Sequence, residues 1–214
     1  MSEHFLLSPE NYDAVKTAAV ASLRAGDVVC MAMDGAYVYA AYAFDQNAVY
    51  SIHRMRESNP GTQLQVLVGD SKTIAGIATH FTADLAKLGE KFWPGPLTIL
   101  VTPNKGLAWD LGDNGELDEF AVRIPSSQFI RDVVSATGPV AIASASIAGL
   151  SPTTSINFVQ GDSVALYIDE GDLDSLQDSF QPSTLVRAKK EGGCEVVREG
   201  AISLSQIGAE VALG

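Results

Sequence analysis

The stretch Lys91-Phe92-Trp93-Pro94-Gly95-Pro96-Leu97-Thr98-Ile99-Leu100-Val101 marks the change from a predicted helix to a predicted strand. Residues 82–92 carry apolar side chains at helical spacing, and Pro94 prevents that helix from continuing. Gly95, between two prolines, can adopt a backbone conformation that a side chain would resist. Residues 97–101 are apolar and include β-branched side chains, which favour a strand. The stretch therefore predicts a helix, a rigid turn and a strand in succession.

Hydrophobic periodicity predicts further helices and strands on both sides of this stretch. The predicted helices lie at 11–25, 45–55, 72–92, where one or two helices fit, and 126–138. The predicted strands lie at 27–33, 64–68, 97–101, 120–125, 140–143, 164–168, 181–186 and 195–202, and residues 33–40 indicate a turn followed by a strand. Roughly seven or eight strands with about four or five helices are typical of a mixed α/β sheet with helices packed on it.

The length and termini of the chain set its expected organisation. With 214 residues it can bury a sizeable core, and we expect residues 1–214 to form a single domain. We expect the residues after Ile202 to form a short tail that leaves no room for a further domain. No window has the apolar length of a membrane span, and residues 1–4 lack the features of a secretion signal. We therefore expect a cytoplasmic protein without a membrane segment.

The formal net charge of −12 limits the partners that the chain can bind. Affinity for nucleic acid depends on Lys and Arg contacts to phosphates, so direct binding to a broad nucleic-acid surface is not expected. A local basic pocket for a small anion stays compatible with an acidic protein. The two cysteines and three histidines are scattered along the chain without metal-ligand spacing, so no protein-held metal site is predicted.

Three arginines lie at positions where the guanidinium charge is expected to have a specific partner. Arg123 lies in the apolar predicted strand 120–125, and it must face solvent, a carboxylate or a bound anion, because an unpaired buried charge is very costly. Arg54 and Arg56 lie near the carboxyl end of the predicted helix 45–55. There they either complement the helix dipole or form a phosphate clamp with the following loop.

A loop rich in small and hydroxyl side chains follows the predicted strand 140–143. Its sequence is Ser144-Ala145-Ser146-Ile147-Ala148-Gly149-Leu150-Ser151-Pro152-Thr153-Thr154. Such a loop is either an ordinary turn or a receptor for phosphates and carboxylates at the end of a strand. The GxGxxG, GxxxxGK[ST] and GxSxG motifs are absent from the sequence, which removes the main support for dinucleotide, P-loop and hydrolase functions.

Five short motifs in order along the chain carry a resemblance to a known family. They are Trp93-Pro94-Gly95-Pro96-Leu97-Thr98, Ala121-Val122-Arg123-Ile124-Pro125, Ser144-Ala145-Ser146-Ile147-Ala148-Gly149, Pro182-Ser183-Thr184 and Arg198-Glu199-Gly200-Ala201. Together they resemble the YrdC family, the threonylcarbamoyl-AMP synthases. The resemblance covers nearly the whole chain, and the first motif is its most specific part.

The resemblance implies an α/β fold, with helices packed on a twisted mixed β-sheet around a central, positively lined cavity. It also implies a reaction in which L-threonine, bicarbonate and ATP yield threonylcarbamoyl-AMP and pyrophosphate, the first stage of the t6A modification of tRNA. ATP would be a substrate, Mg²⁺ would arrive with ATP, and the partner proteins of t6A synthesis would be possible partners. The protein would hold anions in line and neutralise their charge.

The motifs also assign residues, each by its match to the family pattern. Arg56 and Arg123 would be catalytic. The nucleotide would be held by Arg54, Ser58, Ser144, Ser146 and Arg198. The other substrates would be held by Asp34, Tyr37, Ser183 and Thr184.

The sequence departs from the family pattern at several of these positions. The family's PTDTVYG segment falls on residues 32–38, which keep Asp34 and Tyr37 but replace both threonines, by Met33 and Gly35. The Lys-x-Arg pair falls on Arg56 and Ser58 in an ungapped match, and a shifted match to Arg54 and Arg56 needs an insertion. In the SANxSG motif, Ser146 replaces the asparagine and Ala148 the second serine.

These losses leave two functions open. The chain is either an active synthase, a nucleotidyltransferase with altered ligand contacts, or a catalytically weakened paralogue. The weakened protein would bind a nucleotide, a small carboxylate or a partner protein in the same cavity. Loss of one transition-state donor costs about 3 kcal/mol, so several losses together could abolish synthesis.

Overall fold

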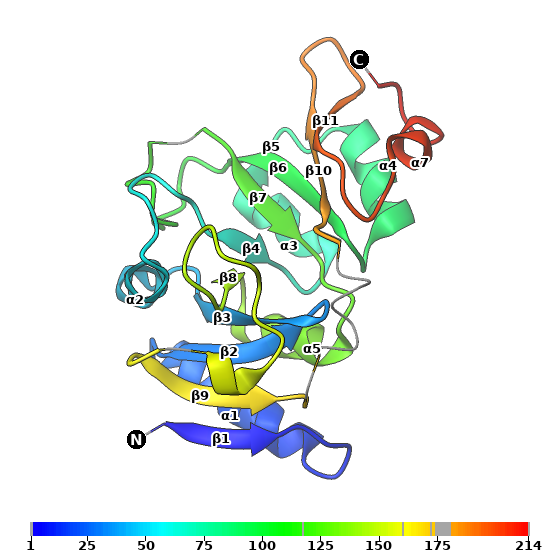
Figure 1. Ribbon diagram of the computed structural model, residues 1–214. Coiled ribbons are helices and arrows are strands. Elements are labelled where there is room, and N and C mark those ends of the chain that lie inside the picture. The colour runs from blue at the N-terminus through cyan, green and yellow to red at the C-terminus, as the bar shows by residue number, and fades with distance from the viewer. Residues whose placement is uncertain (1, 117, 160, 172, 174–180, 214) are drawn as a thin grey trace.

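A computed structural model describes residues 2–116, 118–159, 161–171, 173 and 181–213 as helices packed on a twisted sheet (Figure 1). The helices are α1 (Tyr12–Arg24), α2 (Gln46–Arg56), α3 (Ser71–Ile77), α4 (Ala83–Phe92), α5 (Gln128–Thr137) and α7 (Leu204–Gly208), with a 3₁₀ helix η1 (Ile156–Phe158). The strands are β1 (Glu3–Leu6), β2 (Val28–Met33), β3 (Ala36–Tyr42), β4 (Gln65–Leu67), β5 (Ala78–Thr79), β6 (Leu97–Pro103), β7 (Phe120–Arg123), β8 (Val140–Ser144), β9 (Val164–Asp169), β10 (Thr184–Ala188) and β11 (Cys194–Arg198).

The strands form one mixed sheet in the order β1-β9-β2-β3-β8-β4-β7-β6-β10-β11, with β5 paired to β6. The pairs β1–β9, β9–β2, β4–β7 and β6–β10 are parallel, and the other pairs are antiparallel. In Figure 1 the strand direction turns from nearly horizontal at β1 to nearly vertical at β11. This accumulated twist is the expected consequence of right-handed strand twist, and it confirms the predicted fold class.

Five of the helices have a short polar N-cap residue. Asp45, Asp70, Thr82, Ser127 and Ser203 accept hydrogen bonds from backbone N–H groups in the first turns of α2, α3, α4, α5 and α7. Each such cap satisfies a donor that the helix itself leaves unpaired. The prediction that Ser126 or Ser127 caps the helix after residue 125 is confirmed, and Ser127 is the cap.

Two buried clusters divide the core. One joins α1 and α5 to the sheet through side chains such as Leu23, Phe129 and Val133. The larger cluster joins α2 and α4 to the sheet through side chains such as Ile52, Leu88 and Phe120. Because successive strand residues face opposite sides of the sheet, the residues of β2 and β3 contribute alternately to the two clusters.

The turn between β2 and β3 explains one departure from the family pattern. The strands pair antiparallel with Met33 opposite Ala36, which leaves Asp34 and Gly35 as a two-residue turn. Their φ angles are 52° and 85°. Two positive φ angles define the primed turns that fit tight hairpins, and glycine adopts such angles without steric cost. The hydroxyl-bearing residue that the family has at Gly35 would be strained in this turn.

The stretch that joins α4 to β6 follows the prediction closely. The helix ends at Phe92, and the peptide bond Trp93-Pro94 is cis. The Gly95 N–H donates to the Ile124 carbonyl oxygen at 3.0 Å, and the Trp93 indole Nε1–H donates to the Leu97 carbonyl oxygen at 2.7 Å. These bonds fix the turn against the segment that follows β7.

Four elements were not predicted, among them the 3₁₀ helix η1. Strand β1 pairs with β9 although its burial pattern is mostly exposed, β5 is only two residues long, and α7 lies in the expected tail after Ile202. The last predicted strand, 195–202, is β11 and ends at Arg198. The described part of the chain contains eleven strands, so the predicted number was too low.

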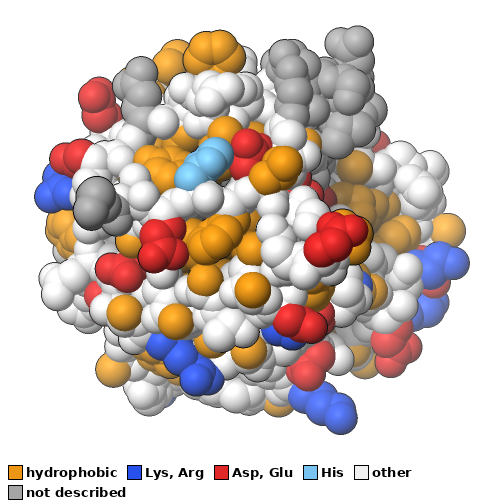
Figure 2. Space-filling view, turned by 90° about the horizontal axis from the view of Figure 1, so that it is seen from below, with side chains coloured by type: hydrophobic (Ala, Val, Ile, Leu, Met, Phe, Trp, Pro, Cys, Tyr) orange, Lys and Arg blue, Asp and Glu red, His pale blue; other side chains and the backbone are white. Residues whose placement is uncertain are grey.

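The exterior agrees with the acidic composition. Figure 2 shows acidic side chains scattered over the face seen from below, with basic side chains at only a few places. Among the described residues, the apolar length of every helix falls short of what a bilayer crossing requires.

We expect Gly95→Ala to destabilise the protein by about 1–3 kcal/mol, because the added Cβ would collide with the Phe92 carbonyl oxygen. The free energy of unfolding from urea titration measures this change. Gly106→Ala is the matched control, since a Cβ there meets no atom within 4 Å. Equal stability of the two variants would contradict the tight turn described above.

Candidate anion-binding site

A cavity of about 420 Å³ lies where the β2–β3 turn, β8, β4, β7 and the ends of β10 and β11 converge. This volume is within the range of small-molecule sites. Its lining residues come from segments far apart in sequence: Met33, Asp34, Ala36, Val38, Arg56, Gln63, Gln65, Arg123, Ile142, Ala143, Ser144, Pro152, Gln181, Pro182, Ser183 and Arg198. Among the described residues, three arginines and one carboxylate line it, so this lining is positive although the whole chain is acidic.

Arg123 is the most deeply buried of the three arginines, with a side chain 4% exposed. Its Nη2 lies 2.6 Å from Oδ2 of Asp34, and its Nε–H donates to the Gly95 carbonyl oxygen at 2.7 Å. Oδ1 of Asp34 accepts a hydrogen bond from the Ser126 hydroxyl. The partner is therefore a carboxylate, and the solvent-facing alternative for Arg123 is wrong.

The ion pair does not use the whole guanidinium of Arg123. Its Nη2 lies 2.6 Å from one carboxylate oxygen of Asp34, and its Nε–H is used by the Gly95 carbonyl oxygen. Hydrogen bonds to an ionised group are stronger than neutral ones, so an oxygen anion that reaches this guanidinium would be stabilised. Arg123 can therefore take part in holding a carboxylate or phosphate.

Arg56 reaches the cavity from the last turn of α2. Its Nη1 donates to the carbonyl oxygen of Ser144 and, at 2.9 Å, to that of Ser146. The Ala148 N–H donates to the Arg56 carbonyl oxygen at 2.7 Å, so the hydroxyl-rich loop is held at both the side chain and the backbone of Arg56. Arg56 thus fixes the loop after β8 while it lines the cavity.

A chain of polar side chains crosses the cavity floor. Gln65 Nε2 donates to Thr98 Oγ1 at 2.8 Å, and Thr98 Oγ1 lies 2.7 Å from Ser183 Oγ. Arg198 Nη2 donates to the Ser183 carbonyl oxygen at 2.9 Å and to Ser183 Oγ at 3.3 Å. This chain links the middle of the sheet to its last strand and sets the position of Arg198.

Burial affects the pKa of two arginines of the cavity without changing their charge. It lowers the pKa of Arg56 and of Arg123, since each guanidinium loses contact with water. The Asp34 carboxylate opposes the effect at Arg123. Guanidinium groups keep their proton at neutral pH, so both remain cations. Their incomplete solvation favours an anionic ligand over a neutral one.

Six predicted site residues come together around this cavity: Asp34, Arg56, Arg123, Ser144, Ser183 and Arg198. Ser146 adjoins it, with its Oγ 2.9 Å from the Ser144 hydroxyl, but its own surface faces a separate pocket near Tyr39 and Met55. Six of the eleven residues that the resemblance assigned therefore line one cavity, and their roles stay predictions.

Four predicted residues do not line the cavity. Tyr37 points into the core, where its hydroxyl donates toward Asp169 Oδ1 at 2.7 Å. Arg54 lies on the exterior with Asp162 and the Ser163 hydroxyl. Ser58 Oγ is buried without a hydrogen-bond partner among the described residues, away from the cavity lining.

The fourth of these residues, Thr184, is fully buried. Its Oγ1 accepts hydrogen bonds from the N–H groups of Gly200 and Ile202, both at 2.9 Å, and donates to the Ile202 carbonyl oxygen at 2.6 Å. These bonds occupy the hydroxyl completely, so the structure gives Thr184 a role in fixing the segment after β11 and not in substrate contact.

Three glutamines of the cavity, Gln63, Gln65 and Gln181, were missed. Gln63 and Gln65 flank the buried Leu64 at the start of β4, and both line the cavity. The signal that could have identified them is a polar side chain within an apolar stretch. The same signal identified Arg123 in β7.

The fold and the cavity define a class of protein: a mixed α/β protein with three arginines on one cavity, an arrangement suited to oxygen anions. A family profile named Sua5/YciO/YrdC and described as telomere recombination matches residues 21–200. The chain belongs to this family, and the predicted resemblance is confirmed.

Named relatives and solved structures agree with this assignment. A Mycobacterium tuberculosis protein is 32% identical over 176 residues, covering 80% of each chain. Mouse threonylcarbamoyl-AMP synthase is 29% identical over 192 residues, covering 86% of this chain and 66% of the mouse protein. The structure of Escherichia coli YciO covers 97% of this chain with a TM-score of 0.79 and 23% identity, and is itself covered completely. Pyrococcus abyssi Sua5 complexed with L-threonine covers the whole chain with a TM-score of 0.81 and 22% identity, and this chain spans 62% of it.

We expect Thr184→Val to lower the free energy of unfolding by about 2–4 kcal/mol, because two buried N–H groups lose their acceptor. Thr184→Ser, which keeps the hydroxyl, is the control and should cost about 1 kcal/mol. Urea titration compares them. If Thr184→Val were as stable as the unaltered protein but failed to bind L-threonine, Thr184 would be a substrate ligand after all.

Proposed function

We propose that this protein is an L-threonylcarbamoyladenylate synthase, a nucleotidyltransferase that acts in the t6A modification of tRNA. The observation that carries the proposal is the convergence of Arg56, Arg123 and Arg198 on one cavity of an acidic chain. The substrates L-threonine, bicarbonate and ATP are all anions or carry a carboxylate. Membership of the family and the names of its relatives support this reaction.

The proposed reaction forms one bond to carbon and one to phosphorus. The amine of L-threonine adds to bicarbonate-derived carbon, loses a proton and releases water, which gives a carbamate. A carbamate oxygen then attacks the α-phosphorus of ATP, and the bond to the β-phosphate oxygen breaks to release pyrophosphate. The protein contributes position and positive charge rather than covalent chemistry.

The geometry distributes these tasks among the lining residues. Arg123 and Ser183 are the buried polar members of the cavity lining, and they suit the carboxylate of L-threonine. Arg56 and Arg198 are less buried and suit the phosphates of ATP, with Ser144 beside them. Asp34 neutralises Arg123 and sets its orientation. Each hydrogen bond between a charged donor and an oxygen anion contributes about 1.5–3 kcal/mol.

The lining residues do not fit a magnesium ion held by the protein. Asp34 is the one lining carboxylate, and it is already paired with Arg123. Within the described part of the chain, no cluster of three or more His, Cys, Asp or Glu side chains could hold a metal. Mg²⁺ would therefore enter with the phosphates of ATP, and the proposal gives it no protein ligand. The proposed reaction takes place in the cytoplasm, with partner proteins of t6A synthesis downstream.

The substituted positions bear on the alternative of a weakened paralogue. Met33 places a thioether in the cavity wall where the family has a hydroxyl, and Ser58 carries no charge where the ungapped match has a cation. The shifted match is not supported, because Arg54 lies outside the cavity. Three arginines nevertheless remain, and the named relatives give the alternative no support.

The decisive experiment measures pyrophosphate release from ATP in the presence of L-threonine, bicarbonate and Mg²⁺. We expect release that depends on both L-threonine and bicarbonate. Arg198→Gln should reduce kcat/KM about 100-fold, because it removes a charged donor to the developing anion. Loss of ATP binding at equal stability would be consistent with this role.

The matched control is Arg187→Gln in β10. Arg187 is also an arginine on a strand of the same sheet edge, but it pairs with Glu119 and Glu195 outside the cavity. It should retain kcat/KM within about twofold. Pyrophosphate release that is absent at high protein concentration, from protein that still binds ATP or L-threonine in calorimetry, would overturn the synthase and establish the weakened paralogue.

A further inference from the structure

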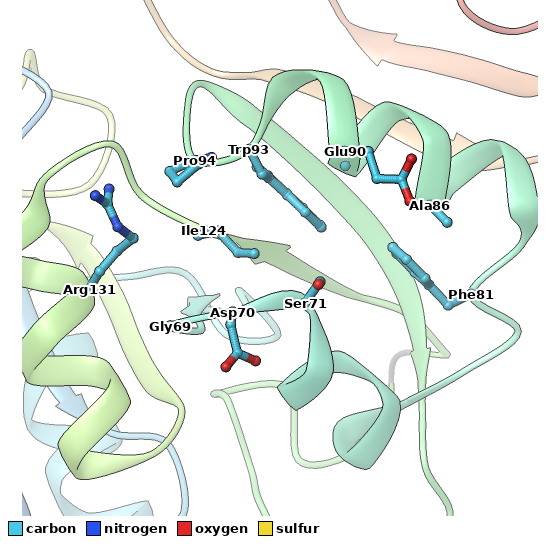
Figure 3. Close-up of a pocket in the computed structure, with 11 residues that line it drawn as sticks. Gly69, Asp70, Ser71, Phe81, Ala86, Glu90, Trp93, Pro94, Ile124 and Arg131 are labelled. Carbon is cyan, nitrogen blue, oxygen red and sulfur yellow. The ribbon is translucent and has the colours of Figure 1, made fainter.

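A second cavity, of about 470 Å³, lies between α3, α4 and α5 (Figure 3). It shares no lining residue with the arginine-lined cavity. We name it the Trp93 pocket, after the tryptophan that directly follows α4. Its volume is sufficient for a small organic ligand, and the proposed reaction makes no use of it.

Two aromatic rings form one side of the Trp93 pocket. The rings of Phe81 and Trp93 are parallel within 5°, with centroids 6.3 Å apart. The Trp93 ring is held in place, because its Nε1–H donates to the Leu97 carbonyl oxygen and its six-membered ring packs against Gly89. Both side chains are only partly buried, so their π-faces form part of the cavity surface.

Carboxylates supply the charge of this pocket. Figure 3 shows Glu90 on the α4 side of the cavity and Asp70 on the α3 side. Glu90 has no ion pair or hydrogen bond with another described side chain. Hydrogen bonds from the Thr73 backbone N–H lower the pKa of Asp70, which keeps this carboxylate ionised at neutral pH.

Arg131 is the one cation among the described lining residues, and it is already engaged. It donates to the carbonyl oxygens of Pro125 and Ser126 and to Gln128 Oε1. Its hydrogen bonds are therefore directed at the neighbouring turn and not at Glu90 or Asp70. The pocket keeps an excess of negative charge beside two aromatic faces, which disfavours an anion.

We propose that the Trp93 pocket binds a small organic cation, an alkylguanidinium or alkylammonium group, against Phe81 and Trp93 with Glu90 as its counter-charge. Cation–π attraction acts within about 6 Å of a ring centroid, and the two centroids are 6.3 Å apart, so a cation seated against this side of the pocket lies in range of both rings. A planar guanidinium can also stack on the parallel ring faces. Glu90 supplies the negative partner that such a cation requires.

The test uses n-butylguanidinium and its neutral, planar isostere n-butylurea as probes. The chain has two tryptophans, so the Trp109→Phe variant leaves Trp93 as the single indole reporter of fluorescence. We expect butylguanidinium to change Trp93 fluorescence saturably and to bind at least about tenfold more tightly than butylurea. Equal affinity for both probes would overturn the proposal.

Variants separate the counter-charge from general electrostatics. We expect Glu90→Gln to weaken butylguanidinium binding about fivefold or more, while Glu3→Gln, which removes the same charge on β1, leaves it unchanged. Equal weakening by the two variants would overturn the role of Glu90. Circular dichroism confirms that each variant is folded, and Phe81→Leu should weaken binding in the same assay.

A second pair of probes identifies the source of the cation. N-acetylarginine methylamide presents the same guanidinium on a peptide backbone. Binding of butylguanidinium alone assigns the pocket to a free small cation, and binding of both probes admits an arginine side chain. Both results support the cation site, whereas failure of both probes in the folded protein rejects it. None of these measurements depends on synthase activity, so the two proposals can fail separately.

Discussion

The burial of the Arg123 charge is the constraint on which the arrangement of this protein depends. A guanidinium with a 4% exposed side chain is tolerated only if fixed partners surround it. The partners come from distant parts of the chain: the carboxylate of Asp34 in the β2–β3 turn and the carbonyl oxygen of Gly95 before β6. The contacts that stabilise the Arg123 charge therefore hold the β2–β3 turn and the turn before β6 against the end of β7. The arginine-lined cavity lies where these segments converge.

The charges of the whole chain are also unevenly distributed. The chain carries a net charge of −12, yet its arginines at 56, 123 and 198 face inward to one cavity. Screening by salt weakens the repulsion between the acidic exterior and an anion beyond a distance of about 8 Å, whereas a ligand inside the cavity meets the arginines at contact. The proposed binding of small anions relies on this arrangement.

Most of the fold could be predicted because its signals are local. The cap at Ser127, the helix end before Pro94 and the strand that contains Arg123 each follow from a few neighbouring residues. Strand β1 could not be predicted, since its pairing with β9 depends on contacts far along the chain. The site was harder to predict than the fold, because it too depends on contacts between distant parts of the chain. Tyr37 and Thr184 match family motifs, yet their hydroxyl groups form hydrogen bonds within the fold. Motif matching identifies positions, and only tertiary contacts show which atoms remain available.

The segment Pro94-Gly95 is a partition with a cavity on each side. Pro94 and Ile124 belong to the wall of the Trp93 pocket, while the carbonyl oxygen of Gly95 holds Arg123 in the other cavity. The Gly95 N–H donates to the Ile124 carbonyl oxygen at 3.0 Å, which ties the two segments together. The two cavities are therefore not built independently of each other. The turn that ends a helix forms part of the wall of one cavity and positions the buried arginine of the other.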